Sequence, residues 1–402
     1  MPRFEPFRAL RYSPSLDLGL VAAPPYDVLD DDDLARLRRR HPRNIVTIDV
    51  PPSTEGVARY ANAARTMRSW IDDGTLLTDP TGSFTLYRME FVDATGTPRR
   101  TVGVIGALEV VDEGAGGVLP HERTTPKAST DRLDLTRATD ANLSPVWGLS
   151  LTAGLSGLLA APAEAMGELV DDDGVRHIVE RVTDPDRIAE IAAAVGAHPV
   201  LIADGHHRYA VGRTYRDECR AAGRTDGAAE LTLAYVAELV EEQLSIAAIH
   251  RLYNGIAADD LLDVLSRSFD TSPAGTVGQG HLAELVGRGS LCFVHPDGSG
   301  TWLSPRPEAF AGVRNLDGAL LEHALAGTPA EVSYQHGVDH VLSALRTGAA
   351  DAAVLIRPTD ITEIRRTADE GLLMPPKSTF FTPKLRTGLV VRRLGEGPAE
   401  RP

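Results

Sequence analysis

Strand-forming runs recur in pairs along this chain, and a turn sequence joins the members of each pair. Three such pairs are residues 84–92 with 101–111, 167–170 with 175–182, and 291–295 with 301–303. The connecting segments are rich in Asp, Gly and Pro, which favour tight turns between antiparallel neighbours. Residues 231–240 and 244–252 form a further pair of apolar runs, although the first run also fits a helix. The pattern predicts antiparallel sheet over much of the chain.

Segments with apolar residues at helical spacing separate these pairs. They are residues 31–40, 57–73, 185–195, 209–222, 258–269, 316–326, 338–345 and 360–370. The mixture predicts an α+β (mixed α/β) fold, with largely antiparallel or mixed sheets and flanking helices. The 402 residues suffice for two or three domains. We expect an α/β core over residues 1–253 and a C-terminal α/β domain over 254–402, whose last segment could return to the site of the first.

Charge and cysteine content narrow the class of protein. The formal net charge of −15 disfavours nucleic acid and anionic membranes as partners, so any anion site must be built locally. The two cysteines, Cys219 and Cys292, provide neither a disulfide framework nor a cysteine-rich metal site. No apolar signal region opens the sequence, and no apolar run approaches the length needed to span a bilayer. A cytoplasmic protein that acts on small molecules is the expectation.

The segment 199–210, Pro-Val-Leu-Ile-Ala-Asp-Gly-His-His-Arg-Tyr-Ala, carries the strongest chemical signal. An apolar strand ends at Asp204, and Gly205 leads into a helix through His206, His207 and Arg208. A helix start offers unpaired N–H groups and a positive dipole end, and Arg208 can grip an anion with two parallel hydrogen bonds. Asp204 could bind Mg²⁺ or accept a proton. The alternative is a structural turn in which Asp204 caps the helix and the histidines face solvent.

A second polar segment follows the run Gly-Gly-Val-Leu-Pro at 116–120. Its side chains are His121, Glu122, Arg123, Thr124, Lys127, Asp131 and Arg132. Glu122 could serve as a general base, and Lys127 could meet a phosphate as a point charge. His121, Thr124 and Arg132 are candidates for binding the substrate. The alternative is a solvated charged loop, and Thr125 breaks the His-Glu-x-x-His zinc motif.

Two proline-rich segments are weaker candidates. Two prolines present Tyr26 and Asp27, either for substrate binding or as a rigid turn with a local cap. Near the other end, residues 374–385 interleave lysines with aromatic residues and prolines. There Lys377, Ser378 and Thr379 could close over a substrate, or the segment is an edge strand with exposed lysines. Lysine is scarce, because Lys127, Lys377 and Lys384 are the only three in the sequence.

Together these motifs resemble one family, the domain of unknown function numbered 1015. The matching pieces are Pro-Pro-Tyr-Asp-Val at 24–28, His121-Glu122-x-x-Thr125 with Lys127, Asp-Arg-Leu at 131–133, Asn142-x-Ser144-Pro145, the 203–209 turn, and Met-Pro-Pro-Lys-Ser-Thr-x-Phe at 374–381. The turn at 204–208 also resembles the nucleotide-phosphate loop of the partition-protein/sulfiredoxin-like fold, which includes free serine kinases with a similar Asp-Gly-His-His-Arg turn. That resemblance implies a nucleotide-binding element. The turn holds no cysteine, which argues against sulfinic-acid reduction.

The resulting hypothesis is an ATP- or ADP-dependent phosphotransferase of a small hydroxylated metabolite, with serine or a related amino acid as the candidate acceptor and Mg²⁺ as the bridging ion. Asp204, His206, His207, Arg208 and Glu122 would carry the chemistry. Gly205 and Lys127 would join His207 and Arg208 in holding the nucleotide. Three alternatives remain: a phosphatase or other hydrolase that uses the same anion site, a nucleotide-sensing module without turnover, and a metal bound by His121, His206 and His207.

Overall fold

The computed structural model describes residues 1–93, 96–122, 129–224 and 227–395. The chain divides into two compact units: unit 1 comprises Met1–Ser245 and Pro383–Pro402, and unit 2 comprises Ile246–Thr382. The boundary expected at residues 253 and 254 lies inside strand β14 (Ile249–Asn254). Unit 2 is therefore inserted between two segments of unit 1, and the end of the chain belongs to unit 1.

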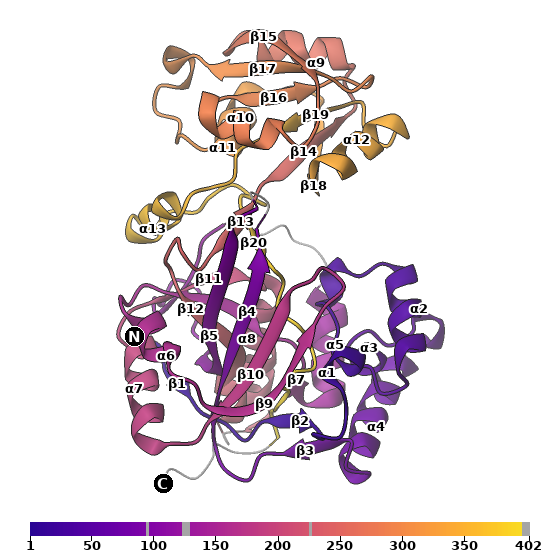
Figure 1. The fold of residues 1–402 in the computed structure, drawn as a ribbon, viewed down its shortest axis with the longest axis vertical. Helices are drawn as coiled ribbons and strands as arrows, with labels where there is room; N and C mark the ends of the chain where they lie inside the picture. The colour runs from indigo at the N-terminus through magenta and orange to yellow at the C-terminus, as the bar shows by residue number, and fades with distance from the viewer. Residues whose placement is uncertain (94–95, 123–128, 225–226, 396–402) are drawn as a thin grey trace. The chain divides into compact units, whose positions relative to one another are not determined.

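A nine-stranded mixed sheet forms the centre of unit 1 (Figure 1). Its order is β6-β11-β8-β12-β5-β4-β10-β9, and β1 pairs with β5. The β11–β6 and β12–β8 pairs are parallel, whereas the other pairs in the sheet are antiparallel. The strands are β1 (Phe4–Glu5), β4 (Phe84–Val92), β5 (Pro98–Glu109), β6 (Val118–Pro120), β8 (Val146–Ser150), β9 (Glu164–Val170), β10 (Arg176–Val182), β11 (Val200–Asp204) and β12 (Leu231–Glu238).

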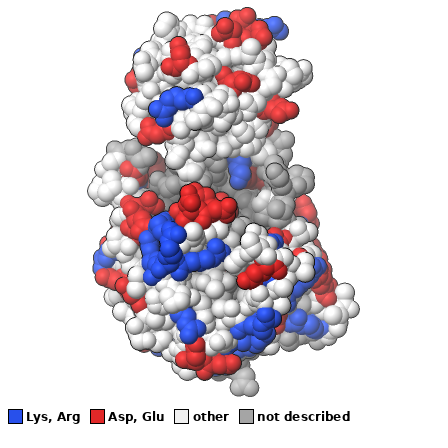
Figure 2. All heavy atoms as spheres, turned by 90° about the vertical axis from the view of Figure 1, so that its right-hand side faces the viewer, with Lys and Arg blue, Asp and Glu red and all other residues white. Residues whose placement is uncertain are grey.

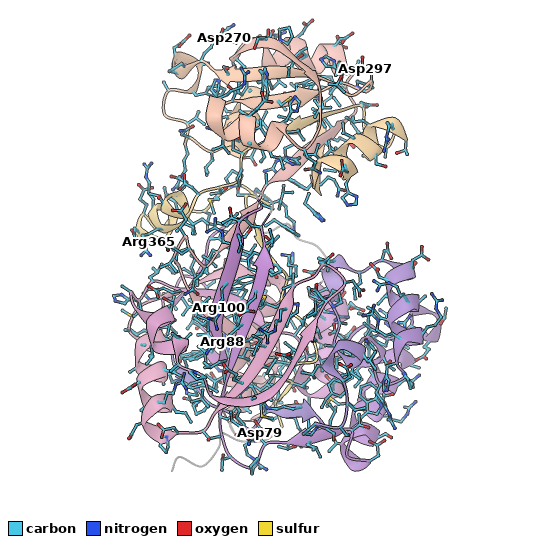
Figure 3. All side chains as sticks on the ribbon, in the orientation of Figure 1. Asp79, Arg88, Arg100, Asp270, Asp297 and Arg365 are labelled. Carbon is cyan, nitrogen blue, oxygen red and sulfur yellow. The ribbon has the colours of Figure 1, made fainter. Side chains whose placement is uncertain are left out.

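Helices cover this sheet and build a second core beside it. They are α1 (Leu18–Val21), α2 (Asp31–Arg40), α3 (Val46–Asp49), α4 (Ala58–Asp72), α5 (Ser129–Thr139), α6 (Leu155–Ala160), α7 (Pro185–Gly196) and α8 (His206–Ala221), with short 3₁₀ turns at η1 (Tyr26–Val28), η2 (Ser53–Glu55) and η3 (Ala228–Glu230). Leu159 of α6 and Ile191 of α7 pack into the core of the sheet, and Leu37 and Trp70 belong to the separate core around α2 and α4. Arg88 on β4, labelled in Figure 3, ties α6 to the sheet by donating to Glu180 (2.7 Å) and to the carbonyl of Leu159 (3.0 Å).

Unit 2 is built from one continuous stretch of chain around an antiparallel sheet in the order β15-β17-β16-β19-β14-β18. Besides β14, its strands are β15 (Phe269–Thr276), β16 (Leu291–Val294), β17 (Ser299–Pro305), β18 (Glu331–His336) and β19 (Ala352–Leu355). Its helices are α9 (Ala258–Leu265), α10 (His281–Arg288), α11 (Asp317–Ala324), α12 (Val338–Arg346) and α13 (Ile361–Asp369), with a 3₁₀ turn at η4 (Pro307–Phe310). Two apolar clusters, one containing Phe269 and Phe293 and the other Trp302 and Val341, form its core.

Small two-stranded pairings complete the architecture. β2 (Leu10–Tyr12) pairs with β3 (Leu76–Thr78), and β13 (Ser245–Ala247) pairs with β20 (Phe380–Thr382). β21 (Arg392–Arg393), near the end of the chain, pairs with β7 (Ala141–Asn142) in unit 1. Isolated bridges join Val391 to Leu10 and Thr387 to Ala23. Residues 383–395, which we call the C-terminal strap, therefore complete unit 1 after the chain has passed through unit 2.

The predicted α+β class is confirmed, as are the three hairpins and most of the helices. One helix was predicted too long: α9 ends at Leu265, and Phe269 begins β15 although it continues the apolar spacing. Among the described residues, no helix is long and apolar enough to cross a membrane. On the face shown in Figure 2, acidic and basic side chains lie side by side on both units.

Candidate functional site

The strand-to-helix turn predicted at 199–210 is present, and its geometry leaves a helix start without a side-chain cap. β11 ends at Asp204, Gly205 adopts φ +85°, and α8 begins at His206. The N-cap residue is Gly205, so Asp204 does not cap the helix as the structural alternative required. No acidic residue lies in the first turn of α8, which instead carries His206, His207 and Arg208. The N–H groups and dipole of a 16-residue helix thus meet cationic and titratable side chains.

Asp204 is held between two cations. Nη2 of Arg208 donates to Oδ2 of Asp204 (2.6 Å), and Nζ of Lys384 donates to Oδ1 (3.1 Å). Burial by itself would raise the pKa of Asp204, but the charges of Lys384 and Arg208 outweigh it and lower that pKa. Burial would likewise lower the pKa of Arg208, but the Asp204 carboxylate outweighs it and raises that pKa. Asp204 and Arg208 are therefore both charged at neutral pH.

Arg208 lies directly against Gly205. A Cβ added at Gly205 would lie 3.0 Å from both Cζ and Nε of Arg208, so both the positive φ and the close guanidinium require glycine here. Nη1 of Arg208 donates to the carbonyl of Pro145. Its Nε is buried and has no hydrogen-bond acceptor among the residues that the structure describes. A buried guanidinium with an unused N–H beside a helix start suits an anionic ligand.

The parallel pairing of β6 with β11 brings the second polar segment to this turn. Nδ1 of His121 donates to the carbonyl of Ile202 (2.5 Å), and its ring centroid lies 5.0 Å from that of His206. Burial lowers the pKa of His121 to about 4, so the imidazole is neutral at pH 7. Oε2 of Glu122 lies 3.8 Å from Nε2 of His121. The two clusters that the sequence singled out therefore meet at His121 and Glu122.

The rest of that segment divides in two. Arg123, Thr124 and Lys127 lie outside the described residues. Asp131 and Arg132 are in helix α5, not in the loop that the density of polar residues suggested. Leu133 and Leu135 are buried on two sides of this helix, Leu133 in a cluster with Tyr215 of α8 and Leu135 in the core around α2 and α4.

Arg132 connects α5 with two elements from the start of the chain. Its Cζ lies 4.2 Å from the ring centroid of Tyr26, and its Nη1 pairs with Oδ1 of Asp49 on α3 (3.2 Å). Arg132 and Arg208 line the same cavity, so Tyr26 of η1 lies near the turn. Burial raises the pKa of Asp49 against the charges of Arg132 and Arg208. Tyr26 and Arg132 are thus near Arg208, and the role of Tyr26, Asp27 and Arg132 in substrate binding stays a prediction.

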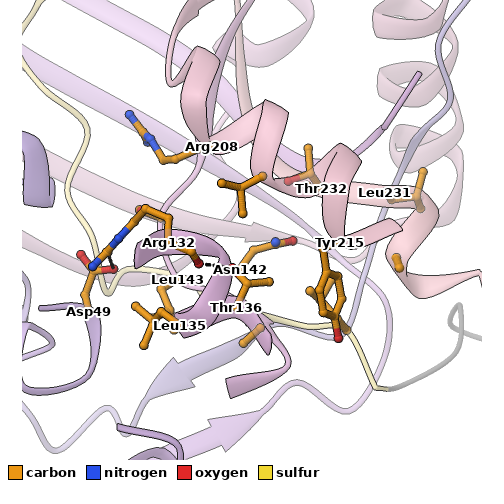
Figure 4. Close-up of a pocket in the computed structure, with 16 residues that line it drawn as sticks. Asp49, Arg132, Leu135, Thr136, Asn142, Leu143, Arg208, Tyr215, Leu231 and Thr232 are labelled. Carbon is orange, nitrogen blue, oxygen red and sulfur yellow. Dashed lines mark hydrogen bonds and ion pairs between the residues drawn. The ribbon is translucent and has the colours of Figure 1, made fainter. Parts of the chain in front are cut away.

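A small cavity lies between α5 and α8 (Figure 4). Its volume is about 50 Å³, and its lining includes Asp49, Arg132, Asn142, Arg208 and Tyr215. Drug-sized ligands occupy pockets of about 300–1,000 Å³, whereas a water molecule needs only about 10–15 Å³. The cavity has room for a few water molecules and none for a nucleotide. A nucleotide at this site must therefore bind outside the cavity, at the partly exposed start of α8.

Lys377, Ser378 and Thr379 belong to unit 2. Lys377 has φ +57°, a conformation that favours glycine, and its carbonyl accepts from Nη1 of Arg251 (3.2 Å). Ser378 and Thr379 are buried, and Oγ of Ser378 donates to the carbonyl of Pro375 (2.8 Å). These contacts give the segment a structural role within unit 2, and its substrate role stays a prediction.

The sequence analysis missed two charged residues of the site, Lys384 and Asp49. The scarcity of lysine was the available signal for Lys384, but nothing in the spacing links residue 384 to residue 204. Asp49 ends a four-residue helix and has no motif around it. The predicted metal alternative also gains no support, because the described residues contain no group of three or more His, Cys, Asp or Glu side chains able to hold a metal ion.

None of the curated proteins matches the sequence significantly. Solved structures that are similar include a conserved hypothetical protein from Pyrococcus furiosus (12% identity, TM-score 0.36, covering 66% of this chain and 87% of that one) and a free serine kinase variant in complex with AMP (11%, 0.38, 66% and 84%). A C-terminally truncated SbnI from Staphylococcus aureus is also similar (14%, 0.37, 70% and 84%).

These identities and TM-scores are too low to carry an activity across to this chain. The sequence match to a family is of a different kind, because it spans most of the chain and both polar clusters of the site. It confirms the family resemblance that the motifs predicted. The chain belongs to the family described as protein of unknown function (DUF1015), whose sequence model matches residues 4–319.

Proposed function

We propose that the protein is an ATP- or ADP-dependent phosphotransferase that phosphorylates the hydroxyl group of a small metabolite, with serine as the first acceptor to test. One observation carries the proposal: the uncapped, cation-rich start of α8 lies beside Glu122 and the neutral His121. An anion cradle next to a carboxylate is what phosphoryl transfer to an alcohol requires, because the reaction depends on charge neutralisation and positioning.

The nucleotide phosphates would lie on the backbone N–H groups that follow Gly205. Arg208, already fixed by Asp204 and Pro145, would neutralise charge on the transferred group, and His206 and His207 would steady it. Lys127 would add positive charge from the segment after Glu122. Mg²⁺, when bound, would neutralise the phosphate oxygens, with Asp204 as its candidate ligand.

Glu122 is a better candidate for the general base than Asp204. The pKa of Asp204 is lowered by two cations, and a weakly basic carboxylate is a poor proton acceptor. Oε2 of Glu122 lies 3.8 Å from Nε2 of His121, and that imidazole is neutral at pH 7. The acceptor would lie among Tyr26, Asp27, His121, Thr124 and Arg132.

The test is nucleotide-dependent phosphorylation of a panel of amino acids and other small alcohols, followed by mass spectrometry and ³¹P NMR. Glu122→Gln should reduce turnover at least 100-fold and keep nucleotide affinity within about threefold. Glu113→Gln is the matched control, since the Glu113 side chain is 86% exposed and pairs with Arg213 at 3.2 Å. It should leave both quantities unchanged.

Other outcomes would replace the proposal. Release of inorganic phosphate from phosphoserine without nucleotide would identify a phosphatase that uses the same anion site. Tight nucleotide binding with no product from any acceptor, unaffected by Glu122→Gln, would identify a nucleotide-sensing module. Absence of both nucleotide binding and product would contradict the proposal outright.

A further inference from the structure

The C-terminal strap follows a fixed path through unit 1 (Figure 1, yellow). Thr387 bridges Ala23, Val391 bridges Leu10, and β21 pairs with β7. Arg392 is buried and donates to the carbonyls of Leu231 (2.8 Å) and Ala228 (2.7 Å). The strap is therefore part of the core of unit 1 although it is separated in sequence from the rest of that unit.

A buried network fixes the beginning of the strap. Nη2 of Arg386 pairs with Oδ2 of Asp171 (2.9 Å), which also accepts from Nε2 of His177 (2.9 Å). Nδ1 of His177 and the Tyr87 hydroxyl lie 2.7 Å apart, and the backbone N–H of Arg386 donates to the same hydroxyl (3.2 Å). His177 and Tyr87 are fully buried. Lys384, two residues before Arg386, is thereby held in a defined place.

That place is the start of α8, where one carboxylate, Asp204, faces two cations. Arg208 already pairs with Asp204, and the first turn of the helix contains no acidic side chain. A helix N-terminus carries partial positive charge, so bringing the Lys384 ammonium to it opposes the dipole. Partial burial of that ammonium, whose side chain is 16% exposed, adds a desolvation penalty. The second cation is explained if this end of α8 accepts an anion of more than one negative charge.

We propose that Lys384 is a phosphate-binding residue of the cradle at Asp204–Arg208, delivered by the C-terminal strap. The inference deepens the proposed function and rests on it, and it assigns a polyphosphate as the class of ligand. Asp204 would hold Arg208 and Lys384 apart, so that both cations face the same phosphate groups. Lys384 lies beyond residues 4–319, so this part of the site falls outside the segment matched to the family.

The experiment is isothermal titration of the full-length protein with inorganic pyrophosphate and with ADP. Lys384→Met should weaken both affinities about tenfold or more, while Lys384→Arg, which keeps the charge, should stay within about threefold of the wild type. Arg39→Gln is the control, because it removes one positive charge from an exposed position on α2. It should leave both affinities unchanged.

The outcomes separate the two proposals. If the wild type binds both probes and Lys384→Met binds them equally well, the role of Lys384 is overturned and the proposed function stands. If the wild type binds neither probe, both are overturned. Should Lys384→Met not fold, acetylation of wild-type lysines replaces it, because only three lysines need to be followed. Pyrophosphate should then slow acetylation of Lys384, and an unchanged rate would overturn the inference.

Discussion

The first turns of helix α8 in unit 1 and helix α13 in unit 2 both have unpaired backbone N–H groups, but different side chains surround them. At α13, the carboxylate of Asp360 accepts from the N–H of Glu363 (2.7 Å), and Glu363 adds negative charge to the first turn. At α8, Gly205 offers no side chain, and the nearest charged groups include Arg208 and Lys384. The chain satisfies α13 by itself, whereas α8 remains ready for a ligand's negative charge.

Two helices of unit 1 have the aspartate cap that α8 lacks. Asp30 caps α2 by accepting from Asp33 (2.8 Å), and Asp184 caps α7 by accepting from Arg187 (2.8 Å). Other helix starts, such as that of α4, also lack a side-chain cap, so the absence of a cap alone does not distinguish α8. A glycine at the N-cap with cations in the first turn indicates a different use. The predictions below test whether that use is anion binding.

The largest effect is expected from Arg208→Met, which removes the guanidinium at the start of α8. The affinity for ADP should fall about 100-fold or more, because a charged group that contacts the ligand is lost and Asp204 loses one of its two partners. Isothermal titration measures it. Asp360→Ala is the control at α13: it should lower the free energy of unfolding by about 1 kcal/mol and leave the affinity unchanged. An Arg208→Met affinity within threefold of the wild type contradicts the account.

Lowering the pH should reduce the stability of both units in the same way, whereas ligand binding is expected in unit 1 alone. Burial lowers the pKa of His121 in unit 1 and of His250 in unit 2 to about 4 each, whereas in the unfolded chain both titrate near 6.5. Between pH 6.5 and 4, these two histidines are protonated in the unfolded chain but remain neutral in the folded protein. The stability that each contributes is therefore present above pH 6.5 and is lost as the pH falls towards 4.

Urea unfolding at several pH values measures this effect. Each histidine can contribute up to about 1.4 kcal/mol per pH unit across that window. His121→Asn and His250→Asn should each reduce the slope of stability against pH between 6.5 and 4. If either variant keeps the wild-type slope, that histidine is not buried in its neutral form.

The smallest effect is expected from Gly→Ala variants, which distinguish backbone strain from the contact between Gly205 and Arg208. Gly205 (φ +85°) and Gly289 at the end of α10 (φ +64°) both have a left-handed conformation, so Gly→Ala at either should cost about 1–2 kcal/mol of stability. A Cβ at Gly205 also meets Arg208 at 3.0 Å, whereas at Gly289 the nearest atom is 3.7 Å away on Arg357. Only Gly205→Ala should weaken ADP binding, by about tenfold. Equal affinities for ADP in the two variants would show that the position of Arg208 does not affect ADP binding.

The local parts of this account could be predicted from the sequence. The turn at Gly205 follows from an apolar strand that ends in Asp-Gly, and hairpins such as β4–β5 follow from Gly- and Pro-containing turns between alternating runs. The meeting of Glu122 with the turn was required by the hypothesis but not visible in the spacing. It depends on the parallel pairing of β6 with β11, which joins residues about 80 positions apart.

Long-range placement is what the sequence could not provide. Lys384 reaches Asp204 only because unit 2 is inserted before the strap, and no local pattern encodes that insertion. Helix α5 was not predicted, because its polar residues suggested a loop. Burial of Leu133 and Leu135 in the folded protein stabilises the helix. Local motifs could thus be identified from the sequence, whereas the other groups of the site come from distant segments.

A crystal structure of the protein with ADP tests the central claim most directly. The β-phosphate should lie on the backbone N–H groups of residues 206–208, within hydrogen-bond distance of the Arg208 guanidinium, and the start of α13 should carry no phosphate. ADP bound elsewhere, with the start of α8 unchanged and Arg208 still held only by Asp204 and Pro145, would contradict the account.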